Sequence, residues 1–378
     1  MKIVIAPDSY KESLTALEAA NAIEAGFKEV LPDAQYIKIP MADGGEGTVQ
    51  SLVDATNGRI IEQEVTGPLG DKVTAFFGLL GDGKTAVIEM AAASGLHVIP
   101  SHKRNPLVTT TWGTGELIKA ALDTNITHLI VGIGGSATND GGAGMIQALG
   151  GKLLDKNGHQ IGFGGGELHK LHTIDLSTID ARLQNVQIDV ACDVENPLTG
   201  THGASAVFGP QKGASAEMVT TLDANLTHFA TITERVLNRS TRNIPGAGAA
   251  GGLGFGLLTF LSSQLKRGID IVLEATAFHE HVQGASLVIT GEGRIDSQTI
   301  FGKTPIGVAK AAKAYNIPVI GIAGSISTDS DVVREHGIDA VFSIVPGAMP
   351  LEEALANAET YVSLTARNVA SLFSLKRS

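Results

Sequence analysis

The chain has 378 residues, a formal net charge of −11 and 46 glycines. This acidic balance argues against a nucleic-acid surface and against a polybasic membrane patch. The single cysteine, Cys192, excludes an intramolecular disulfide and any multi-cysteine metal site, which is typical of a reducing compartment. Because Cys192 continues the apolar run Val190–Ala191, we interpret it as a core residue rather than a catalytic thiol. We expect a cytoplasmic protein.

The first part of the chain alternates short apolar runs with helical patterns, the order typical of parallel βαβ units. Here we expect strands at 2–6 and 36–40 and helices at 15–30 and 47–55. Thr15 is followed three residues later by Glu18, which is the spacing of a capping box. This pair predicts that the first helix begins at Thr15.

The pattern becomes β-rich near Gly58. The strands expected first look antiparallel, because tight-turn residues such as Asp82 and Gly83 separate them. A βα unit and further β-rich sequence follow. The expected elements are strands at 59–66, 72–79, 85–91 and 128–134, a helix at 141–149 and a strand at 186–191.

Strict alternation resumes at Leu287. We expect strands at 287–290, 319–323 and 340–345 and helices at 305–315, 329–335 and 350–357. Pro305 and Pro350 fall in first turns of helices, where proline is tolerated. The two ends of the chain, residues 1–60 and 270–378, are therefore predicted to form one parallel α/β domain. Residues 61–269 form an inserted, β-rich α/β domain in this prediction.

Two motif matches lack the structural context that their chemistry needs. Gly78–Thr85 satisfies the pattern of a phosphate-binding P-loop, but the strand-like run Ala86–Ile88 follows it instead of a helix. Gly246–Gly251 matches a dinucleotide-binding fingerprint, but Arg242–Pro245 before it is not a strand. We therefore expect neither a P-loop nor a Rossmann dinucleotide site.

The uncharged stretch Gly246–Leu265 has about the length of a membrane span and contains GxxxG spacing. Its first half consists mostly of glycine and alanine, and Ser262 and Gln264 lie near its end. We interpret it as a buried glycine loop that leads into a short helix, and we expect no membrane contact.

Polar, glycine-containing loops follow several predicted strands. They are Ala6–Ser13, Met41–Thr48, Gly134–Gly142, Val190–Leu198 and Thr290–Ser297, the last leading to Phe301–Pro305. Ligands of α/β sheets bind beyond the carboxyl ends of strands, where glycine N–H groups and helix N-termini attract anions. Carboxylates can hold Mg²⁺ or accept a proton, and Lys11, Arg294 and Lys303 can neutralise a triphosphate. Any single loop could be an ordinary turn, but together they favour a polyphosphate-and-metal site.

Six segments resemble the signature segments of the type I glycerate kinase family and occur in the family's order. They are Ala6–Ser13, Ala42–Thr48, Gly134–Gly142, Cys192–Leu198, Pro245–Gly254 and Thr290–Pro305. The resemblance implies a flavodoxin-like parallel-sheet domain with an inserted swivelling β/β/α domain. It also implies transfer of the γ-phosphoryl group of ATP to the 2-hydroxyl of D-glycerate, with Mg²⁺ as cofactor. Phosphorylation of the 3-hydroxyl remains an alternative, and a nicotinamide-dependent oxidoreductase is a more distant one. The expected partners are D-glycerate and ATP, the expected assembly a monomer or homodimer.

Residue roles follow from this resemblance and from the chemistry of phosphoryl transfer. The catalytic candidates are Asp193, Asp296 and Lys11, with Asp193 favoured as general base and Asp296, with Glu292, as metal ligand. The expected substrate-binding residues are Ser9, Asp43, Gly44, Gly45 and Arg294. The expected phosphate- or nucleotide-binding residues are Gly135, Ser136, Asn139, Asp140, Gly141, Gly293 and Lys303. For any one of them, a turn or a solvated loop is the competing interpretation.

Overall fold

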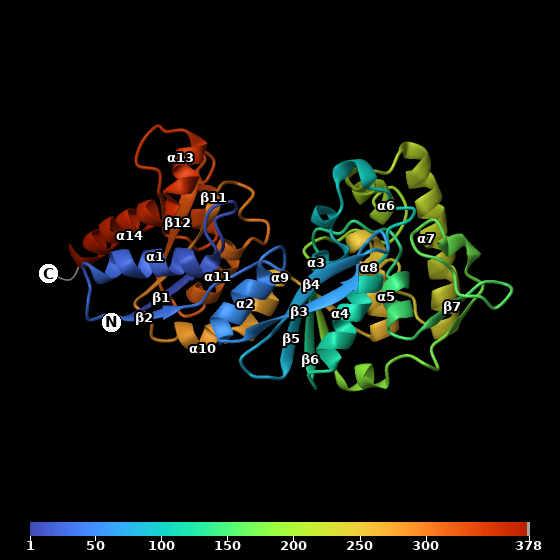
Figure 1. Cartoon of the computed structure of the whole chain (residues 1–378). Helices are drawn as coiled ribbons and strands as arrows, with labels where there is room; N and C mark the ends of the chain where they lie inside the picture. The colour runs from blue at the N-terminus through green and yellow to red at the C-terminus, as the bar shows by residue number, and fades with distance from the viewer. Residues whose placement is uncertain (376–378) are drawn as a thin grey trace. The chain divides into compact units, whose positions relative to one another are not determined.

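The computed structural model describes residues 1–375 and forms two compact units (Figure 1). Unit 1 contains Met1–Asp43, Gln50–Asn57 and the chain from Ile269 onward. Unit 2 contains Gly44–Val49 and Gly58–Gly268. The chain therefore leaves and re-enters unit 1, and the expected division lay near residues 60 and 270.

Unit 1 is built on a five-stranded, fully parallel sheet. Its strands are β1 (Lys2–Pro7), β2 (Gln35–Lys38), β11 (Leu287–Ile295), β12 (Val319–Ile326) and β13 (Ala340–Ser343). Their order is β13-β12-β11-β1-β2, which reads 2-1-3-4-5 when the strands are numbered as they occur in this unit. This is the flavodoxin-like order, so the predicted fold class is confirmed. The nearly continuous apolar runs of β1 and β11 fit strands that are covered on both faces.

Helices of unit 1 begin and pack as simple chemistry dictates. They are α1 (Ala16–Lys28), α9 (Gly268–Ala275), α10 (Phe278–Val282), α11 (Thr304–Lys313), α12 (Val332–Glu335), α13 (Leu351–Ala356) and α14 (Ala358–Leu375), with α2 (Thr48–Thr56) shared between the units. The predicted capping box is confirmed, since Thr15 Oγ1 accepts the Glu18 N–H and the Glu18 carboxylate accepts the Thr15 N–H. In Figure 1, α1 and α14 lie side by side. Gly26 permits this, because a Cβ there would lie 2.2 Å from Ser363 O.

Strand β11 is longer than the sequence suggested. The strand was expected to end at Thr290 and to be followed by a loop, but residues 291–295 continue the strand, which pairs with β12. A Cβ on Gly291 would lie 1.8 Å from Ile322 O, so this glycine serves close strand packing rather than a turn. The loop therefore begins at Asp296, beyond Arg294.

Unit 2 is built on a six-stranded mixed sheet. Its strands are β3 (Arg59–Thr66), β4 (Lys72–Leu79), β5 (Thr85–Glu89), β6 (His128–Gly132), β9 (Gln187–Ala191) and β10 (Gln264–Lys266). The order is β10-β9-β6-β5-β4-β3, in which β5, β6, β9 and β10 run parallel. The antiparallel pairing that was predicted for the first three strands is confirmed. A two-stranded sheet of β7 (Lys152–Leu154) and β8 (Thr173–Asp175) accompanies them.

Helices make up more of unit 2 than the β-rich prediction allowed. They are α3 (Ala91–Ser94), α4 (Trp112–Leu122), α5 (Ala143–Ala148), α6 (Ala204–Phe208), α7 (Ala216–Leu237) and α8 (Ala249–Leu261). The 22-residue helix α7 was not predicted. Its many threonines and valines favour strands by propensity, but Leu222, Leu226 and Phe229 are buried at helical spacing, and this burial decides the conformation.

The glycine stretch before and inside α8 is buried, as predicted. Residues 250–252 have positive φ, which interrupts the helix, and a Cβ on Gly251 would lie 1.9 Å from Thr138 O. The glycines that resemble a dinucleotide fingerprint therefore let this segment contact the loop after β6. Among residues 1–375, no helix is long and apolar enough to cross a membrane.

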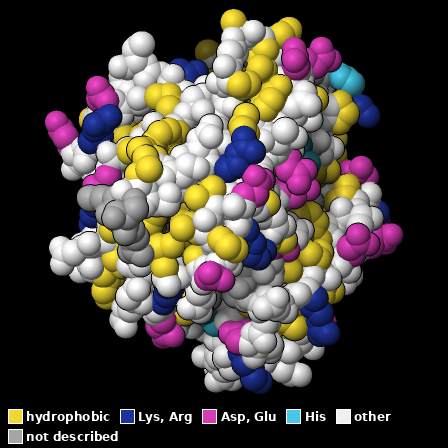
Figure 2. All heavy atoms as spheres, turned by 90° about the vertical axis from the view of Figure 1, so that its left-hand side faces the viewer, with side chains coloured by type: hydrophobic (Ala, Val, Ile, Leu, Met, Phe, Trp, Pro, Cys, Tyr) yellow, Lys and Arg dark blue, Asp and Glu magenta, His cyan; other side chains and the backbone are white. Residues whose placement is uncertain are grey.

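Charged side chains of both signs are interspersed on the face drawn in Figure 2. Ion pairs also form at helix surfaces, as between Lys28 and Glu24, whose side-chain atoms lie 2.7 Å apart. Exposed pairs of this kind contribute little to stability. The mixed charge also gives a polyanion no continuous basic area to follow on that face.

Candidate active site

Asp8 lies directly after β1, at the point of unit 1 where the strand order reverses between β1 and β11. In flavodoxin-like sheets, ligands bind at this switch point. Ser9 N–H donates to Asp8 Oδ1 at 2.6 Å, and Thr304 Oγ1 donates to Asp8 Oδ2 at 2.5 Å. Burial raises the pKa of Asp8 to about 6, and the charge of Asp43 adds to this effect. The carboxyl group is therefore held ready to change its protonation state near neutral pH.

Glu292 lies on the neighbouring strand β11. Thr299 Oγ1 donates to Glu292 Oε1 at 3.0 Å, and Lys303 Nζ lies 3.4 Å from Glu292 Oε2. Burial raises the pKa of Glu292 to about 7; Lys303 and Thr299 oppose this rise, and the charge of Asp8 adds to it. Asp8 and Glu292 are thus two partly buried carboxyl groups, and the charge of Asp8 opposes the ionisation of Glu292.

Asp8 and Glu292 suit the expected Mg²⁺ better than a site formed entirely by protein ligands would. Mg²⁺ is commonly bound through one or two carboxylates and completed by water and substrate phosphates. Within residues 1–375, no cluster of three His, Cys, Asp or Glu side chains could hold a metal ion. The carboxylates of Asp8 and Glu292 nevertheless offer the oxygen donors that Mg²⁺ prefers, so the residues present fit a metal that arrives with a phosphate.

Asp296 and Arg294 occupy the end of β11 and the turn after it. Arg294 Nε lies 3.1 Å from Asp296 Oδ2, and the Gln298 N–H donates to Asp296 Oδ1 at 2.9 Å. The Arg294 side chain is 66% exposed and that of Asp296 only 15%. Asp296 therefore shapes the turn, while Arg294 remains accessible to a ligand.

Lys303 immediately precedes α11, and Lys11 belongs to the turn after β1. The N-cap residue of α11 is Lys303, whose side chain makes no cap hydrogen bond, and Thr304 directs its hydroxyl to Asp8. Lys11 is exposed, and among residues 1–375 it forms no side-chain hydrogen bond or ion pair. A Cβ on Gly293 would lie 3.6 Å from Lys11 N, so Lys11 and Gly293 are neighbours. Unit 1 therefore gathers its predicted cations around the same strand ends as Asp8 and Glu292.

In unit 2, the segment Gly44–Val49 packs over the carboxyl ends of the parallel strands. A Cβ on Gly44 would lie 2.6 Å from Ala191 Cβ, and one on Gly132 would lie 2.8 Å from Gly44 O. Glu89, the last residue of β5, is buried and accepts the Val49 N–H at 2.8 Å. Burial raises the pKa of Glu89, and hydrogen bonds from this segment oppose the rise. Glu89 thus fixes the segment that carries Gly44 and Gly45.

The loop after β6 combines an exposed apex with a buried base. Gly135 is exposed and has φ +72°, whereas Ser136 is 5% exposed. Further along the loop, Asn139 and Asp140 are buried, with exposures of 0% and 1%. Gly141 is buried too, and a Cβ there would lie 3.0 Å from the Phe229 ring. Of the predicted phosphate-binding residues in this loop, only the apex is open to a ligand.

The Asp140 carboxylate is saturated with donors. Its Oδ2 accepts the N–H and the hydroxyl of Thr111 at 2.8 and 2.9 Å and the Gly144 N–H at 3.2 Å, and its Oδ1 accepts the Gly142 N–H at 3.1 Å. Burial raises the pKa of Asp140, and these hydrogen bonds oppose the rise. Asn139 Nδ2 donates to Ser205 Oγ at 3.0 Å. Both side chains therefore hold the loop in place from inside.

Asp193 follows β9 and is exposed, with its Oδ1 accepting the Gly268 N–H at 3.1 Å. Its neighbour Cys192 bonds only weakly, through Sγ to Val194 O at 3.4 Å. Burial raises the pKa of the Cys192 thiol, which fits the predicted core residue rather than a nucleophile. Asp193 is thus an exposed carboxylate at this sheet end that is hydrogen-bonded to the chain.

Four polar residues of these clusters were missed in the sequence. Asp8 and Thr304 lie inside two of the polar segments that the sequence indicated, Ala6–Ser13 and Phe301–Pro305, and this position was the signal for them. Glu89 was visible as a lone carboxylate at the end of an apolar run. Lys212 gave no signal: it is 1% exposed, and its Nζ reaches Ser136, 76 residues away in the chain.

Known proteins match this chain over its whole length. The profile of the "Glycerate kinase family" matches residues 3–374. Glycerate kinase of Bacillus subtilis (strain 168) is 69% identical over 377 residues, which cover 100% of this chain and 99% of that protein. Glycerate 2-kinase of Escherichia coli (strain K12) is 58% identical over 375 residues, which cover 99% and 98%. The crystal structure of a protein named glycerate kinase 2 from Salmonella typhimurium LT2 has a TM-score of 0.93 at 59% identity and covers 100% of this chain and 99% of that one.

Proposed function

Because this chain belongs to the glycerate kinase family, we propose that it transfers the γ-phosphoryl group of ATP to the 2-hydroxyl of D-glycerate, giving 2-phospho-D-glycerate and ADP. The observation that carries the proposal is the 58% identity to the E. coli glycerate 2-kinase over 99% of this chain. The resemblance seen in the sequence motifs is thereby confirmed. We also propose that the reaction takes place in the cytoplasm, where ATP is available.

Phosphoryl transfer requires positioned substrates and compensation of the charge on the transferring group, and no protein nucleophile. We propose that Mg²⁺ is held in unit 1 by Glu292, with Asp8 as a second carboxylate and Asp296 as an alternative ligand. When bound there, Mg²⁺ would neutralise charge on the phosphates. The oxygen donors of Asp8 and Glu292 support this assignment, and a bound dication would favour the ionised form of both groups against the burial that raises their pKa values.

Three cations are assigned to the anionic parts of the substrates. Lys303 precedes the uncapped N-terminus of α11, whose partial positive charge favours a phosphate. Arg294 is exposed and has the planar fork that suits a carboxylate or a phosphate. Lys11 is exposed beside Gly293 and would stabilise the transferring oxygens.

Asp193 is proposed as the general base that accepts the proton of the glycerate 2-hydroxyl. Its exposure leaves the carboxylate accessible, and the hydrogen bond from the Gly268 N–H orients it. General-base catalysis of this kind contributes about 10²–10⁴-fold. The saturated Asp140 has no free oxygen lone pair directed to a ligand and is not assigned this task.

The remaining residues position the two substrates. Ser9, Asp43, Gly44 and Gly45 are proposed to bind glycerate, since they lie in the loops directly after β1 and β2. Gly135, Ser136 and Gly293 are proposed to bind the nucleotide through their backbone. Asn139, Asp140 and Gly141 would support this indirectly, by holding the loop after β6 in shape.

The test is phosphorus NMR of the product made by the purified protein from ATP, Mg²⁺ and D-glycerate. The expected product is 2-phosphoglycerate, with ADP formed in equal amount. A product phosphorylated at the 3-hydroxyl would contradict the regiochemistry, and no consumption of ATP would contradict the activity itself. Nicotinamide reduction by D-glycerate in the absence of ATP would favour the oxidoreductase instead.

A further inference from the structure

Lys212 is a buried ammonium group without an ionic partner. It ends the short 3₁₀ segment Pro210–Lys212 of unit 2, and only 1% of its surface is exposed. Its Nζ donates to Thr138 O at 2.7 Å and to Ser136 Oγ at 3.0 Å. Within residues 1–375, no carboxylate forms a salt bridge with Lys212. Burial of an unpaired charge is unfavourable, so a lysine here calls for an explanation other than stability.

Both acceptors of Lys212 belong to the loop after β6, and they lie beneath its exposed apex. Leu96 N–H donates to Gly135 O, and Ala137 N–H donates to Ser94 O, so the flanks of the loop are tied to the segment after β5. Thr138 N–H donates to Ser136 Oγ, the same oxygen that Lys212 contacts. Lys212 therefore fixes the turn from Ser136 to Thr138, which is held by side-chain hydrogen bonds and not by these backbone hydrogen bonds.

The apex of the loop, Gly134–Ser136, carries backbone N–H groups that are unused as donors in the described part of the chain. Gly134 and Gly135 are exposed, and none of the N–H groups of Gly134, Gly135 and Ser136 donates to an acceptor in the described part of the chain. Gly135 has φ +72°, a conformation that turns successive N–H groups towards one side. Successive N–H groups in such a conformation form an anion-binding concavity.

We infer that Lys212 is a positioning residue for an anion-binding loop formed by Gly134–Ser136, and that this loop takes a phosphate group of the nucleotide. The inference rests on the proposed kinase function and names the residue that positions this part of the nucleotide site. Lys212 does not touch the ligand, because it is buried. It holds Ser136 and Thr138 in the conformation that leaves the three N–H groups without an acceptor in the described part of the chain, and its charge lies beside the same loop, where it favours an anion.

The surroundings of Lys212 act on its charge in opposite directions. Burial lowers the pKa of Lys212 to about 7, and the charge of Asp140 opposes this effect. A bound phosphate would favour the protonated form further, since opposite charges raise the pKa of an amine. Ligand and lysine would therefore stabilise each other across the loop.

The decisive variant is Lys212→Met, which keeps the length of the side chain but removes its charge and donors. We expect the KM for ATP to rise by about tenfold or more, because charge-assisted hydrogen bonds hold the loop. The kcat and the KM for D-glycerate should change by less than about threefold, since the loop acts on ground-state binding of the nucleotide. Ser136→Ala keeps the charge and removes one acceptor, so it should raise the KM for ATP in the same direction by less.

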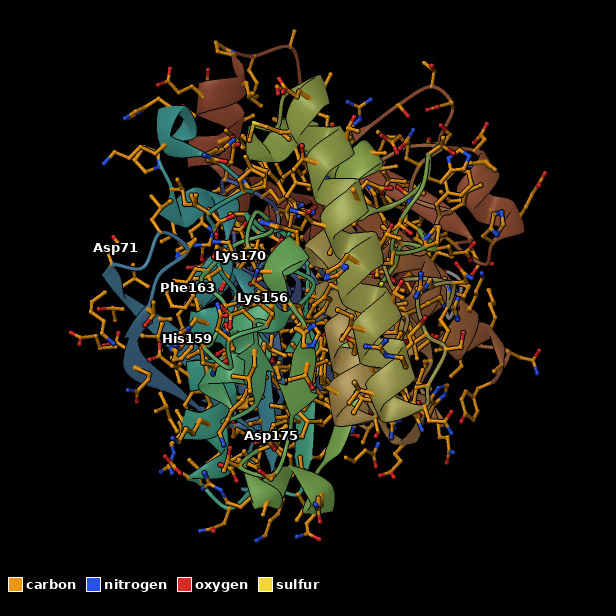
Figure 3. The ribbon with its side chains drawn as sticks, turned by 90° about the vertical axis from the view of Figure 1, so that its right-hand side faces the viewer. Asp71, Lys156, His159, Phe163, Lys170 and Asp175 are labelled. Atoms are coloured by element: carbon orange, nitrogen blue, oxygen red, sulfur yellow. The ribbon has the colours of Figure 1, made fainter. Side chains whose placement is uncertain are left out.

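A matched control is Lys170→Met, at an exposed lysine that pairs with Glu167 at 2.6 Å and is labelled in Figure 3. It removes the same charge from the same unit and should leave all three kinetic constants unchanged. An equal rise in both KM values in Lys212→Met would indicate general damage and overturn the inference. A rise confined to D-glycerate would assign the loop to the other substrate and overturn it as well.

Equilibrium binding separates this inference from the proposed function. Calorimetric titration with ADP and with adenosine needs no turnover, and Lys212→Met should weaken ADP binding while adenosine binding stays the same. If the wild-type protein fails to phosphorylate D-glycerate but shows this difference, the proposed function is wrong and the inference stands. If the wild type is an active kinase and the variant binds ADP as tightly, the inference is wrong. If Lys212→Met does not fold, the same titrations on Ser136→Ala decide, and unchanged ADP binding there overturns the inference.

Discussion

Both units place buried carboxyl groups near the ends of parallel strands, but they surround them differently. In unit 2, Asp140 accepts four hydrogen bonds, and Glu89 accepts backbone N–H groups of the segment Gly44–Val49. In unit 1, Asp8 and Glu292 accept fewer hydrogen bonds than Asp140, and burial is the main cause that raises their pKa values, to about 6 and about 7. A carboxylate that is saturated with hydrogen bonds holds a loop in place. A carboxyl group whose ionisation is opposed by burial is suited to binding a cation or a proton. The contrast separates groups that serve folding from groups available for chemistry.

Substitution of Asp193 has the largest expected effect. It tests the contrast because Asp193 lies in unit 2 and is nevertheless proposed to take part in the chemistry. This residue is exposed, so Asp193→Asn should reduce kcat rather than stability. We expect a decrease of about 10²–10⁴-fold, the usual contribution of a general base. The KM for ATP should change little, because the variant keeps the size and hydrogen bonding of the side chain. Steady-state kinetics at saturating Mg²⁺ check this, and a turnover near that of the wild type would remove Asp193 from the mechanism.

Asp140 should show the opposite behaviour. Asp140→Ala would leave the N–H groups of Thr111, Gly142 and Gly144 without their buried acceptor. We expect a loss of about 3 kcal/mol or more in the free energy of unfolding, because each orphaned buried donor costs about 1–3 kcal/mol. Urea denaturation measures this loss. Asp71→Ala, at an exposed residue labelled in Figure 3, is the control and should stay within about 0.5 kcal/mol.

Glu292 sharpens the comparison through pH. Its folded-state pKa of about 7 lies above the ordinary value of 4.5, so the folded protein binds more protons than the unfolded chain between these values. Stability from this group is therefore lost as pH rises from about 4.5 to about 7. Glu292→Gln stays neutral and should gain about 1–3 kcal/mol relative to the wild type at pH 8 compared with pH 4.5. Denaturant titrations at the two pH values measure the difference.

The same variant should have a functional cost that a purely structural residue would not show. If Glu292 holds Mg²⁺, Glu292→Gln should raise the Mg²⁺ concentration needed for half-maximal rate, and excess Mg²⁺ should restore part of the activity. Equal stability gains at both pH values, or an unchanged Mg²⁺ requirement, would place Glu292 among the structural carboxylates. The contrast between the units would then no longer hold.

The sequence predicted the parallel sheet of unit 1 well, because its buried strands are uninterrupted apolar runs and its helices carry local start signals such as Thr15 and Glu18. It misplaced the end of β11, since a glycine that permits close strand packing looks the same as one that makes a turn. Gly291 is of the first kind, and only the distance to Ile322 O distinguishes the two.

The candidate site was predictable only as a set of loops. Asp140 and Asp193 both follow strands in polar, glycine- or asparagine-containing segments, and local sequence does not say which one is saturated. That depends on Thr111, which reaches Asp140 from a distant part of the chain. Lys212 is the extreme case, because its partner lies 76 residues away and its own surroundings in the sequence resemble an ordinary turn.

Lys84 gives the smallest expected effect. It occupies the lysine position of the P-loop pattern, but it lies in the turn between the antiparallel strands β4 and β5. Asp82 Oδ1 accepts the Lys84 N–H at 2.8 Å, Gly83 has φ +63°, and β5 follows directly, so no helix N-terminus is available to a phosphate there. Lys84→Ala should therefore leave kcat and the KM for ATP within about threefold, as expected for an exposed turn residue. Gly83→Ala is the control for the turn itself, and it should cost about 1 kcal/mol of stability because the positive φ disfavours a side chain. A hundredfold loss of turnover in Lys84→Ala, about 2.7 kcal/mol of barrier, would instead return the phosphates to this turn.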